Sequence, residues 1–286
     1  MSTHTPHSTR QTFYAPEWLI GTRQPVPITV IGAGGTGGEV LDQLCRLHAT
    51  LRALDHPGLH VTLYDGDTVS ESNVGRQRFS ALDVGQYKAN VLINRINLFY
   101  GLSWQGIPAD WSPEVNLGDF AISATDSAAV RHAIADTADD LNTRSFGFSR
   151  QRLWLDFGNG RTDGQAVLGH LNAGGDTQNG VRLPHIIDFY PDMADGNDDG
   201  PSCSVAEALR SQAFGVNAAL VTSAFSTLIW PLFRHGSIDR HALFMDVAEG
   251  SVQPLHIDPV EWSLLGYFPP HEASATSDAS DSPTMG

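Results

Sequence analysis

The sequence predicts a doubly wound α/β fold built around a mixed, mainly parallel sheet. An apolar run at 28–31 leads directly into a glycine-rich turn, and an amphipathic segment follows that turn. A second apolar run at 61–64 ends in Asp65, and a third segment at 119–126 ends in Asp126. Strands that alternate with amphipathic helices in this way favour a parallel sheet covered by helices.

The glycine turn is expected to end the first strand and begin the first helix. Glycine lets the backbone turn sharply, and it lets a phosphate approach bare amide groups at a helix N-terminus. In a doubly wound sheet, an acid at the end of the next strand can bond a ribose, which makes Asp65 a candidate. The glycines of the turn are Gly32, Gly34, Gly35 and Gly37.

The first helix is predicted over 38–54, where apolar side chains recur at spacings of three and four residues. Cys45 lies beside this apolar stripe, and we interpret it as a small buried side chain. Pro57 and Gly58 break the helical pattern before the second strand. The apolar stripe consists of Val40, Leu41, Leu44, Leu47, Leu51 and Leu54.

A polar loop at 72–86 separates the second strand from a second helix, predicted over 87–99. A loop of this length in a compact domain suggests function. Lys88 follows it and is the only lysine among 17 basic residues. A compact ammonium suits a point-charge contact with phosphate, and the alternative is an exposed lysine without a special role. The face of this helix that we expect to pack inward carries Val91, Ile96 and Leu98.

The remaining elements are predicted from shorter patterns. Alternation in 165–171 favours an antiparallel edge strand paired with 153–159. The loop 172–201 is rich in Gly, Asn and Asp, so we expect a mobile segment or a binding element. In chain order the other elements are a strand at 102–108, a strand at 119–126, a helix at 127–139, a helix beginning near Ser204, an apolar helix at 213–232, and a hairpin of 241–247 with 251–257.

Length and composition limit the classes of protein. A chain of 286 residues with 41% hydrophobic residues can bury a full core. We divide it into an N-terminal extension at 1–25, a nucleotide-binding domain at 26–268 that includes the loop 172–201, and a tail at 269–286 with the composition of disorder. A net charge of −15 argues against a nucleic-acid surface.

Neither a membrane span nor a secretion signal is predicted. No apolar run reaches the roughly 18 residues that cross a bilayer, and the N-terminal residues have no apolar signal core. We therefore expect a cytoplasmic protein without membrane partners. Cys45 and Cys203 are the only cysteines, which excludes a disulfide framework and a four-cysteine zinc site, so no zinc is expected.

Taken in order, these motifs resemble the ThiF/MoeB/ubiquitin-activating-enzyme superfamily. Within it, the chain most resembles the ThiF-like family of the bacterial PRTRC gene system. The resemblance covers roughly 26–130 strongly and 150–250 loosely, and the chain lacks the paired CxxC motifs that many relatives use for zinc. The motifs are Gly32-x-Gly34-Gly35-x-Gly37, Asp65-x-Asp67, Asn73-x-x-Arg76-Gln77, Lys88 and Ala124-Thr125-Asp126-Ser127.

The resemblance implies a Rossmann-like adenylation domain that binds ATP and Mg²⁺. It also implies an adenylyltransferase that activates the C-terminal carboxylate of a small ubiquitin-like or sulfur-carrier protein. We expect a homodimer, and relatives often send an N-terminal arginine into a partner subunit's nucleotide site, for which Arg10 and Arg23 are candidates. The implied nucleotide contacts are Gly32, Gly34, Gly35, Gly37, Asp65, Asp67, Asn73, Arg76, Gln77 and Lys88, and the implied catalytic residues are Arg76, Lys88, Asp126 and Cys203.

Asp126 and Cys203 each have an alternative interpretation. Asp126 is expected at the same crevice as Asp65, where carboxylates and a triphosphate can hold Mg²⁺, but it can also cap the helix 127–139. Cys203 precedes a predicted helix N-terminus, which favours a thiolate, although several aspartates upstream disfavour one. Cys203 is thus either a thioester-forming residue, as in several relatives, or a structural thiol.

Two other functions fit parts of the sequence. An NAD-dependent oxidoreductase also uses the pattern Gly32-x-Gly34-x-x-Gly37, but Asp65 lies farther along than the usual acid about 20 residues on. Such an enzyme also has no need of the cations Arg76, Arg78 and Lys88 after the second strand. The other alternative is an inactive ATP-binding module of the same fold, which the absent zinc cysteines leave open.

Overall fold

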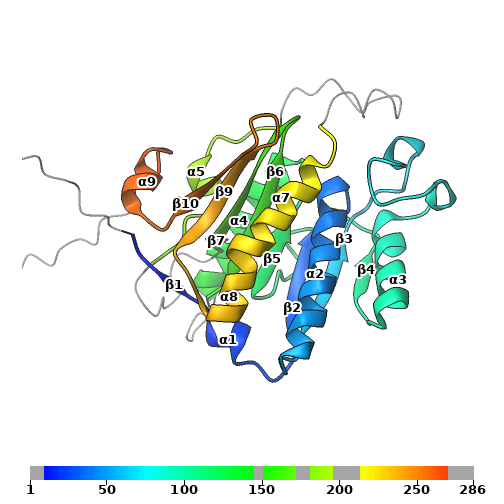
Figure 1. Ribbon diagram of the computed structural model, residues 1–286, viewed down its shortest axis with the longest axis horizontal. Coiled ribbons are helices and arrows are strands. Elements are labelled where there is room, and N and C mark those ends of the chain that lie inside the picture. The colour runs from blue at the N-terminus through cyan, green and yellow to red at the C-terminus, as the bar shows by residue number, and fades with distance from the viewer. Residues whose placement is uncertain (1–9, 145–150, 172–180, 196–212, 270–286) are drawn as a thin grey trace, which may run out of the picture.

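The computed structural model describes residues 10–144, 151–171, 181–195 and 213–269. These residues form an eight-stranded sheet in the order β10-β9-β7-β6-β5-β2-β3-β4, and a separate pair of short strands, β1 and β8 (Figure 1). The predicted α/β class with a mixed, mainly parallel sheet is therefore confirmed. The strands are β1 (Phe13–Tyr14), β2 (Val26–Ile31), β3 (Leu59–Tyr64), β4 (Gln105–Ile107), β5 (Phe120–Ser123), β6 (Leu153–Asn159), β7 (Asp163–His170), β8 (Ser237–Ile238), β9 (Arg240–Asp246) and β10 (Ser251–His256).

The helices lie on both faces of this sheet. In Figure 1, α2, α7 and α8 cross the near face, and α4 lies behind the strands. Helix α2 also contacts α3 and α7, which makes it the centre of the near layer. The helices are α1 (Glu17–Ile20), α2 (Gly35–Ala53), α3 (Lys88–Tyr100), α4 (Ala128–Arg144), α5 (Ile186–Phe189), α7 (Val216–Ala224), α8 (Trp230–His235) and α9 (Pro259–Ser263).

The parallel part of the sheet runs from β6 through β5, β2 and β3 to β4. From β2 the chain passes through α2 to β3 on one side, whereas β5, which comes later, pairs with β2 on the other side. Such a reversal of strand order opens a crevice at the carboxyl ends of the strands. The glycine turn after β2 and the segment after β5 both face this position, so the topology places the site.

The antiparallel part of the sheet corrects one prediction. Strand β7 forms the predicted hairpin with β6, but it also pairs with β9 and is therefore an interior strand, not an edge. The predicted hairpin of β9 and β10 is confirmed, and β10 lies at the edge of the sheet. Pro254 lies in β10, in keeping with the rule that proline is confined to edges because it cannot donate a ladder hydrogen bond.

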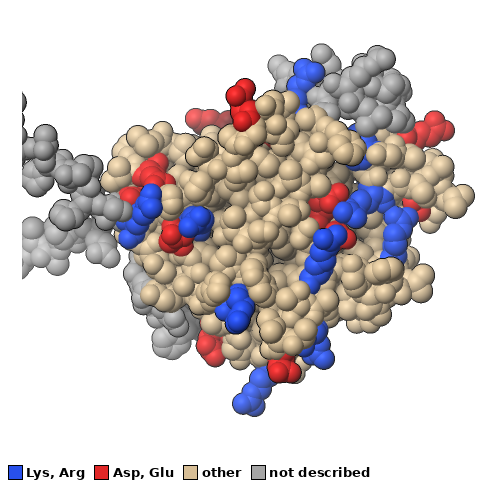
Figure 2. Space-filling model, in the orientation of Figure 1, with Lys and Arg blue, Asp and Glu red and all other residues tan. Residues whose placement is uncertain are grey.

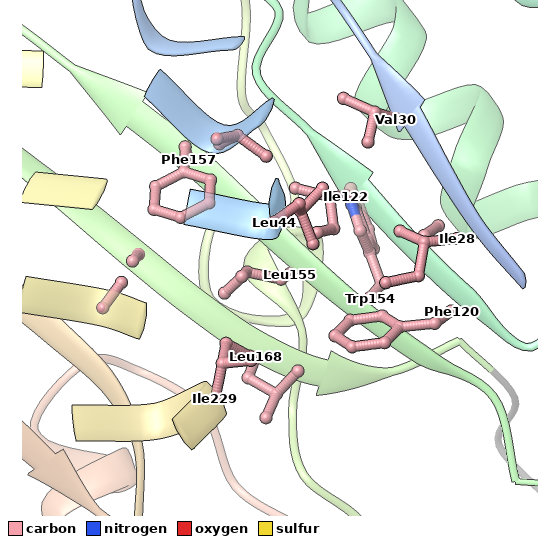
Figure 3. Close-up of a cluster of buried hydrophobic side chains, with 14 of the residues drawn as sticks. Ile28, Val30, Leu44, Phe120, Ile122, Trp154, Leu155, Phe157, Leu168 and Ile229 are labelled. Carbon is pink, nitrogen blue, oxygen red and sulfur yellow. The ribbon is translucent and has the colours of Figure 1, made fainter. Parts of the chain in front are cut away.

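The core lies between the sheet and its helices. Its largest fully buried side chains include Trp154, Phe157 and Phe120, which come from the adjacent strands β5 and β6. Figure 3 shows Phe157 and Phe120 in one cluster with Leu44 of α2 and Ile229 of the near layer, whereas Trp154 points to the other face of the sheet, where its ring contacts His185. Each buried aromatic side chain stabilises the fold by about 1.5–3 kcal/mol relative to an exposed one. The core therefore binds both helical layers to the strands whose ends form the crevice.

Amphipathic helix α2 buries most of its predicted stripe, from Val40 to Leu51, whereas Leu54 follows the helix and is exposed. The face predicted for α3 is partly wrong, because Leu98 is 89% exposed. The residues of α3 that are buried instead are Lys88, Ala89, Val91, Leu92 and Ile93. Burial of Lys88 contradicts its interpretation as an exposed lysine.

The apolar helix predicted at 213–232 is a continuous run of α7, a π-helical segment (Phe225–Ile229) and α8. The run Val216–His235 is long and apolar enough to cross a membrane by length and composition. It packs, however, against α2, β6, β7 and β9, and Leu220, Leu228 and Leu232 are fully buried. The run is thus a core helix of the described fold.

Most of the face that carries α2, α7 and α8 is uncharged. Figure 2 shows basic side chains gathered beside acidic ones on the right of this face, and the ion pairs of α2 and α3 include Arg46 with Asp42, Arg78 with Glu39 and Arg95 with Asp83. Strand β1 pairs with β8, and Leu19 of α1 is fully buried, so residues 13–20 pack on the sheet domain. The predicted tail lies outside the described residues, except that Pro269 is described.

Candidate functional site

A cavity of about 1090 Å³ lies at the carboxyl ends of the parallel strands. Ligand pockets of drug-sized molecules occupy about 300–1,000 Å³, so this one has room for a nucleotide and part of a second substrate. Among the described residues, it brings together every predicted site residue except Gly37, and Cys203 lies outside the described residues. These lining residues are Gly32, Gly34, Gly35, Asp65, Asp67, Asn73, Arg76, Gln77, Lys88 and Asp126.

The glycine turn is held in one conformation by close backbone contacts. Gly32 has a φ of +97°, and a Cβ atom there would lie 2.5 Å from the carbonyl oxygen of Ala124. A Cβ atom at Gly37 would lie 2.0 Å from the carbonyl oxygen of Gly32. Gly37 therefore shapes the turn without lining the cavity. Gly34 is the N-cap of α2 and supplies no side-chain cap, which leaves the helix N-terminus able to receive an anion.

Asp65 joins the end of β3 to the glycine turn. Its Oδ2 atom accepts a hydrogen bond of 2.6 Å from the Ala33 amide, and its Oδ1 atom accepts one of 3.0 Å from the Asp67 amide. Burial raises the pKa of the Asp65 carboxyl above its ordinary value, and these amide hydrogen bonds oppose that effect. The carboxylate is thereby fixed at the cavity wall beside the first helix, where the sequence predicts a contact with ribose.

Lys88 and Asp67 form an ion pair on the same wall. The Lys88 Nζ atom lies 2.7 Å from Oδ2 of Asp67, and the Lys88 amide donates a hydrogen bond to the Asp67 carbonyl. Lys88 is buried at 7% exposure, whereas the side chain of Asp67 is 72% exposed. The Lys88 ammonium is therefore shielded from water, whereas the Asp67 carboxylate can turn toward solvent if a phosphate takes its place.

The predicted loop delivers Asn73, Arg76 and Gln77 to the cavity. Asn73 accepts a hydrogen bond of 2.9 Å from the Ser70 amide, and the Gln77 amide donates one of 2.9 Å to the Asn73 carbonyl. The Nε atom of Arg76 and the Oε1 atom of Gln77 are buried and have no hydrogen-bond partner. Buried polar atoms without partners are rare in folded proteins, so these two atoms indicate a ligand position.

Arg78, expected beside Arg76 at the site, does not line the cavity. Its guanidinium lies 2.7 Å from Glu39 and 3.6 Å from Asp42, both on α2. The physical reason is that two acids of the neighbouring helix hold it at the surface. The cation cluster predicted after the second strand thus consists of Arg76 and Lys88.

Asp126 follows β5 and lines the cavity. It is exposed, and its carboxylate makes no hydrogen bond within the described part of the chain. Its alternative role as a cap of α4 is not seen, because the Ala128 amide at that helix N-terminus donates to Asp195. A second contact holds the segment around Asp195 against α4: the His132 ring lies within hydrogen-bond distance, 2.9 Å, of the Met193 carbonyl oxygen.

A free carboxylate in this position fits Mg²⁺, which is usually bound by one or two carboxylates together with phosphate oxygens and waters. The described residues contain no group of three or more His, Cys, Asp or Glu side chains that could hold a metal ion by themselves. As far as the described residues go, a cation at Asp126 would take its further ligands from the substrate or from water.

Arg131, which no sequence motif indicated, lies in the first turn of α4 and lines the cavity. Its Nε atom lies 2.8 Å from Asp156 of β6, and its Nη2 atom donates a bond of 2.8 Å to the Phe157 carbonyl. Burial raises the pKa of the Asp156 carboxyl, and the Arg131 guanidinium opposes this. The signal in the sequence was Asp156, an acid inside an otherwise apolar strand, because a buried carboxylate needs a basic partner.

Several predicted features lie elsewhere. Cys203, the helix predicted from Ser204 and most of the loop 172–201 lie outside the described residues. Cys45 is buried, and burial raises its pKa to about 12, in keeping with an unreactive thiol. Arg10 lies 3.7 Å from Glu261, and neither Arg10 nor Arg23 lines the cavity of its own chain.

Comparisons with known proteins agree on the fold. The model of the ThiF family matches residues 24–231. A crystal structure of PaaA has 14% sequence identity and a TM-score of 0.51, and the match covers 82% of this chain and 64% of PaaA. E. coli MccB with ATP has 15% identity and a TM-score of 0.51, with 85% and 65% of the two chains covered. E. coli MccB with AMPCPP and MccA has 15% identity and a TM-score of 0.52, with 82% and 64% covered.

The chain spans less than two thirds of the length of these structures. No curated protein matches the sequence. At these identities the structural likeness establishes the fold alone.

Proposed function

The chain belongs to the ThiF family, and we propose that it is an ATP-dependent adenylyltransferase that activates the C-terminal carboxylate of a peptide or small protein. The observation that carries this proposal is the pair of buried, unpartnered atoms, Arg76 Nε and Gln77 Oε1. The side chains of both residues line one cavity with Lys88 and the uncapped N-terminus of α2, so a ligand that reorders these side chains can supply the missing partners. Amide groups, a guanidinium and an ammonium around one volume suit a polyphosphate.

The proposed reaction is a transfer of AMP. A carboxylate oxygen of the acceptor attacks the α-phosphorus of ATP, the bond from that phosphorus to the β-phosphate bridging oxygen breaks, and pyrophosphate leaves. The barrier falls when both reactants are held in line and the negative charge that develops is stabilised by fixed donors. The products are an acyl adenylate and pyrophosphate.

Each side chain has a role that follows from its position. Arg76 and Lys88 bind phosphate oxygens, the glycine amides at Gly34 and Gly35 receive a further phosphate, and Asp65 bonds the ribose. Asn73 uses its amide oxygen within the loop, so its amide nitrogen remains to contact an acyl or phosphate oxygen. Asp126 is the residue that would hold Mg²⁺, which neutralises charge on the departing pyrophosphate.

The neighbours support the choice of ATP and of a second, separate substrate. E. coli MccB was crystallised with ATP, and also with AMPCPP and MccA. The resemblance of the motifs to activating enzymes leads us to propose a small ubiquitin-like or sulfur-carrier protein as the acceptor, in the PRTRC gene system. Transfer to Cys203 as a thioester, a homodimer and a cytoplasmic location are further parts of this proposal.

A binding module without turnover is the second candidate, because the same cavity can hold ATP without catalysis. An NAD-dependent oxidoreductase is less favoured, since Arg76, Lys88 and Asp126 around one cavity exceed what a dinucleotide needs. Thermal shift with ATP·Mg²⁺ against NAD⁺ separates these ligands.

The deciding experiment is ATP–pyrophosphate exchange with the purified chain and small ubiquitin-like proteins from its gene neighbourhood. Each candidate is tested with a free C-terminus and with the same terminus amidated. Exchange that requires the free carboxylate supports adenylation and identifies the acceptor. ATP binding without exchange for any candidate favours the binding module, and binding of NAD⁺ in place of ATP favours the oxidoreductase.

A further inference from the structure

The cavity continues beyond the residues assigned to the nucleotide, along strands β6 and β7. Its lining there includes Arg131, Phe157, Gly158, Asn159 and Gln165. Asn159 accepts a hydrogen bond of 2.8 Å from the Thr36 hydroxyl, which links this region to the start of α2. The nucleotide proposal gives these residues no role, although they share one continuous volume with it.

Arg131 has a donor that the protein does not use. Its side chain is only 8% exposed. The Nε atom is bonded to Asp156 and the Nη2 atom to the Phe157 carbonyl, both at 2.8 Å. The Nη1 atom has no hydrogen bond within the described chain, and it is not among the polar atoms sealed from solvent. The guanidinium is thus rigidly held with one nitrogen open to a ligand oxygen.

Gln165 supplies a second unused polar group in the same region. Its side chain makes no hydrogen bond within the described chain, although it is partly buried at the cavity wall. Gly158 lies between the two residues. A Cβ atom at Gly158 would lie 2.8 Å from Gln165 Nε2 and 3.8 Å from Arg131 Nη2. Gly158 therefore lies next to both groups, and the absence of a side chain there leaves the Gln165 amide its present position beside the Arg131 guanidinium.

We propose that Arg131 and Gln165 bind the terminal acyl group of the acceptor over Gly158. They would bond a carboxylate oxygen before adenylation and the acyl carbonyl oxygen afterwards. This inference rests on the proposed function and assigns the part of the cavity that receives the second substrate. Because Asp156 already neutralises Arg131, the guanidinium offers a directed hydrogen bond with little net charge, so it orients the carboxylate without holding it as a strong ion pair.

The test uses a stable analogue that needs no knowledge of the natural acceptor. We choose 5′-O-(N-glycylsulfamoyl)adenosine, because glycine is the smallest acyl group that carries a main chain, and AMP as its acyl-free counterpart. Dissociation constants of both are measured by calorimetry. The wild-type chain is expected to bind the glycyl analogue more tightly than AMP.

Gln165→Ala is the first variant, because this side chain has no partner whose loss would disturb the fold. Loss of a neutral hydrogen bond is expected to weaken binding of the glycyl analogue about 3- to 10-fold and to leave AMP binding unchanged. The matched control is Gln253→Ala, which removes an exposed glutamine of β10 that does not line the cavity. It should bind both ligands as the wild type does.

Arg131→Lys is the second variant. It keeps a positive charge opposite Asp156 but removes the planar fork, so binding of the glycyl analogue should fall about tenfold or more with AMP unaffected. Thermal unfolding tests whether this variant is folded. If it is not, Gln165→Ala decides alone.

The outcomes separate this inference from the proposal beneath it. Selective loss of the glycyl analogue supports the assignment. An equal loss of both ligands, no loss in either folded variant, or a wild type that binds the analogue no better than AMP overturns it while leaving the nucleotide site in place. A wild type that binds neither AMP nor ATP contradicts the proposed function itself.

Discussion

The Nζ atom of Lys88 lies 2.7 Å from the Oδ2 atom of Asp67, on the wall that also carries the glycine turn. The acid is mostly exposed and the lysine is buried, so the two partners respond differently to a ligand. A phosphate that displaces Asp67 sends that carboxylate into water at small cost, whereas the ammonium stays at the wall. The ion pair therefore keeps the lysine in position for a phosphate.

Lys88→Ala is expected to weaken binding of ATP·Mg²⁺ about tenfold or more and to abolish ATP-dependent adenylate formation. The reason is the loss of a charge-assisted contact of about 1.5–3 kcal/mol. Calorimetric titration with ATP·Mg²⁺ measures the first effect. Stability should change little, because the carboxylate left behind is exposed. Arg46→Ala, which removes an exposed ion pair with Asp42, is the control. Unchanged ATP affinity in Lys88→Ala would remove this residue from the site.

Asp126→Ala tests the predicted magnesium ligand. The carboxylate makes no hydrogen bond within the described chain, so the variant should fold normally. In the wild type, ATP should bind more tightly with Mg²⁺ than with EDTA, because the ion bridges the carboxylate and the phosphates. In Asp126→Ala this gain should fall about tenfold. A gain equal to that of the wild type would show that the ion, if it binds, does not use Asp126.

Two glycine variants separate the shape of the turn from its contact with a ligand. Gly37→Ala places a methyl group 2.0 Å from the Gly32 carbonyl oxygen, so it should lower the free energy of unfolding by about 2 kcal/mol. Gly34→Ala meets nothing within 4 Å and should change stability by less than about 0.5 kcal/mol. Because Gly34 lines the cavity, its variant should instead weaken ATP binding. Urea unfolding and ATP titration measure the two effects, and a reversed pattern would contradict the assignment.

His241 predicts a loss of stability in acid. Burial lowers its pKa to about 4, and in the fold it contacts the Leu168 carbonyl at 2.9 Å and accepts a bond of 2.8 Å from Trp262. In the unfolded chain its pKa is about 6.5, so the unfolded state takes up a proton first as the pH falls. The contribution of His241 is therefore complete above about pH 6.5 and is lost progressively toward its folded pKa of about 4.

Between about pH 7 and pH 5, this residue alone should lower the free energy of unfolding by about 2 kcal/mol. His170, whose pKa burial lowers to about 3, adds a loss of the same sign. His241→Asn should be less stable than the wild type near pH 7 and should lose about 2 kcal/mol less on acidification. Urea unfolding at both pH values measures this, and equal losses in the two proteins would show that His241 is not held neutral.

The sequence predicted correctly those residues of the site that lie close together along the chain. The glycine turn, Asp65, the loop with Arg76 and Gln77, and Lys88 belong to the consecutive elements β2, α2, β3 and α3, and the structure brings them together at one cavity. The glycines of the turn and the charged residues that follow the strands were also informative, because few backbone conformations and few surroundings suit such residues. Leu98 was misplaced because an apolar residue at a helix end satisfies the helical period without having anything to pack on.

Pairings between distant segments were not predicted. Strand β7 looked like an edge because its partner β9 comes much later in the chain, after the apolar helix. Arg131 and Asp156 were missed because their contact joins α4 to β6, and neither sequence motif contains both residues. Arg78 was assigned to the site from its position beside Arg76, but alternate directions of neighbouring side chains send it to Glu39.

Both α2 and α4 begin at the cavity wall, and each helix has a positive pole there. Only the pole of α2 is open, because the Ala128 amide of α4 is already bonded to Asp195. The wall is thus polarised by the protein itself. A molecule with a neutral end and an anionic end can settle in it in one direction, with the anionic end at the glycine turn. For the nucleotide proposed as the ligand, this polarity would distinguish the two ends of the molecule before any contact with its base.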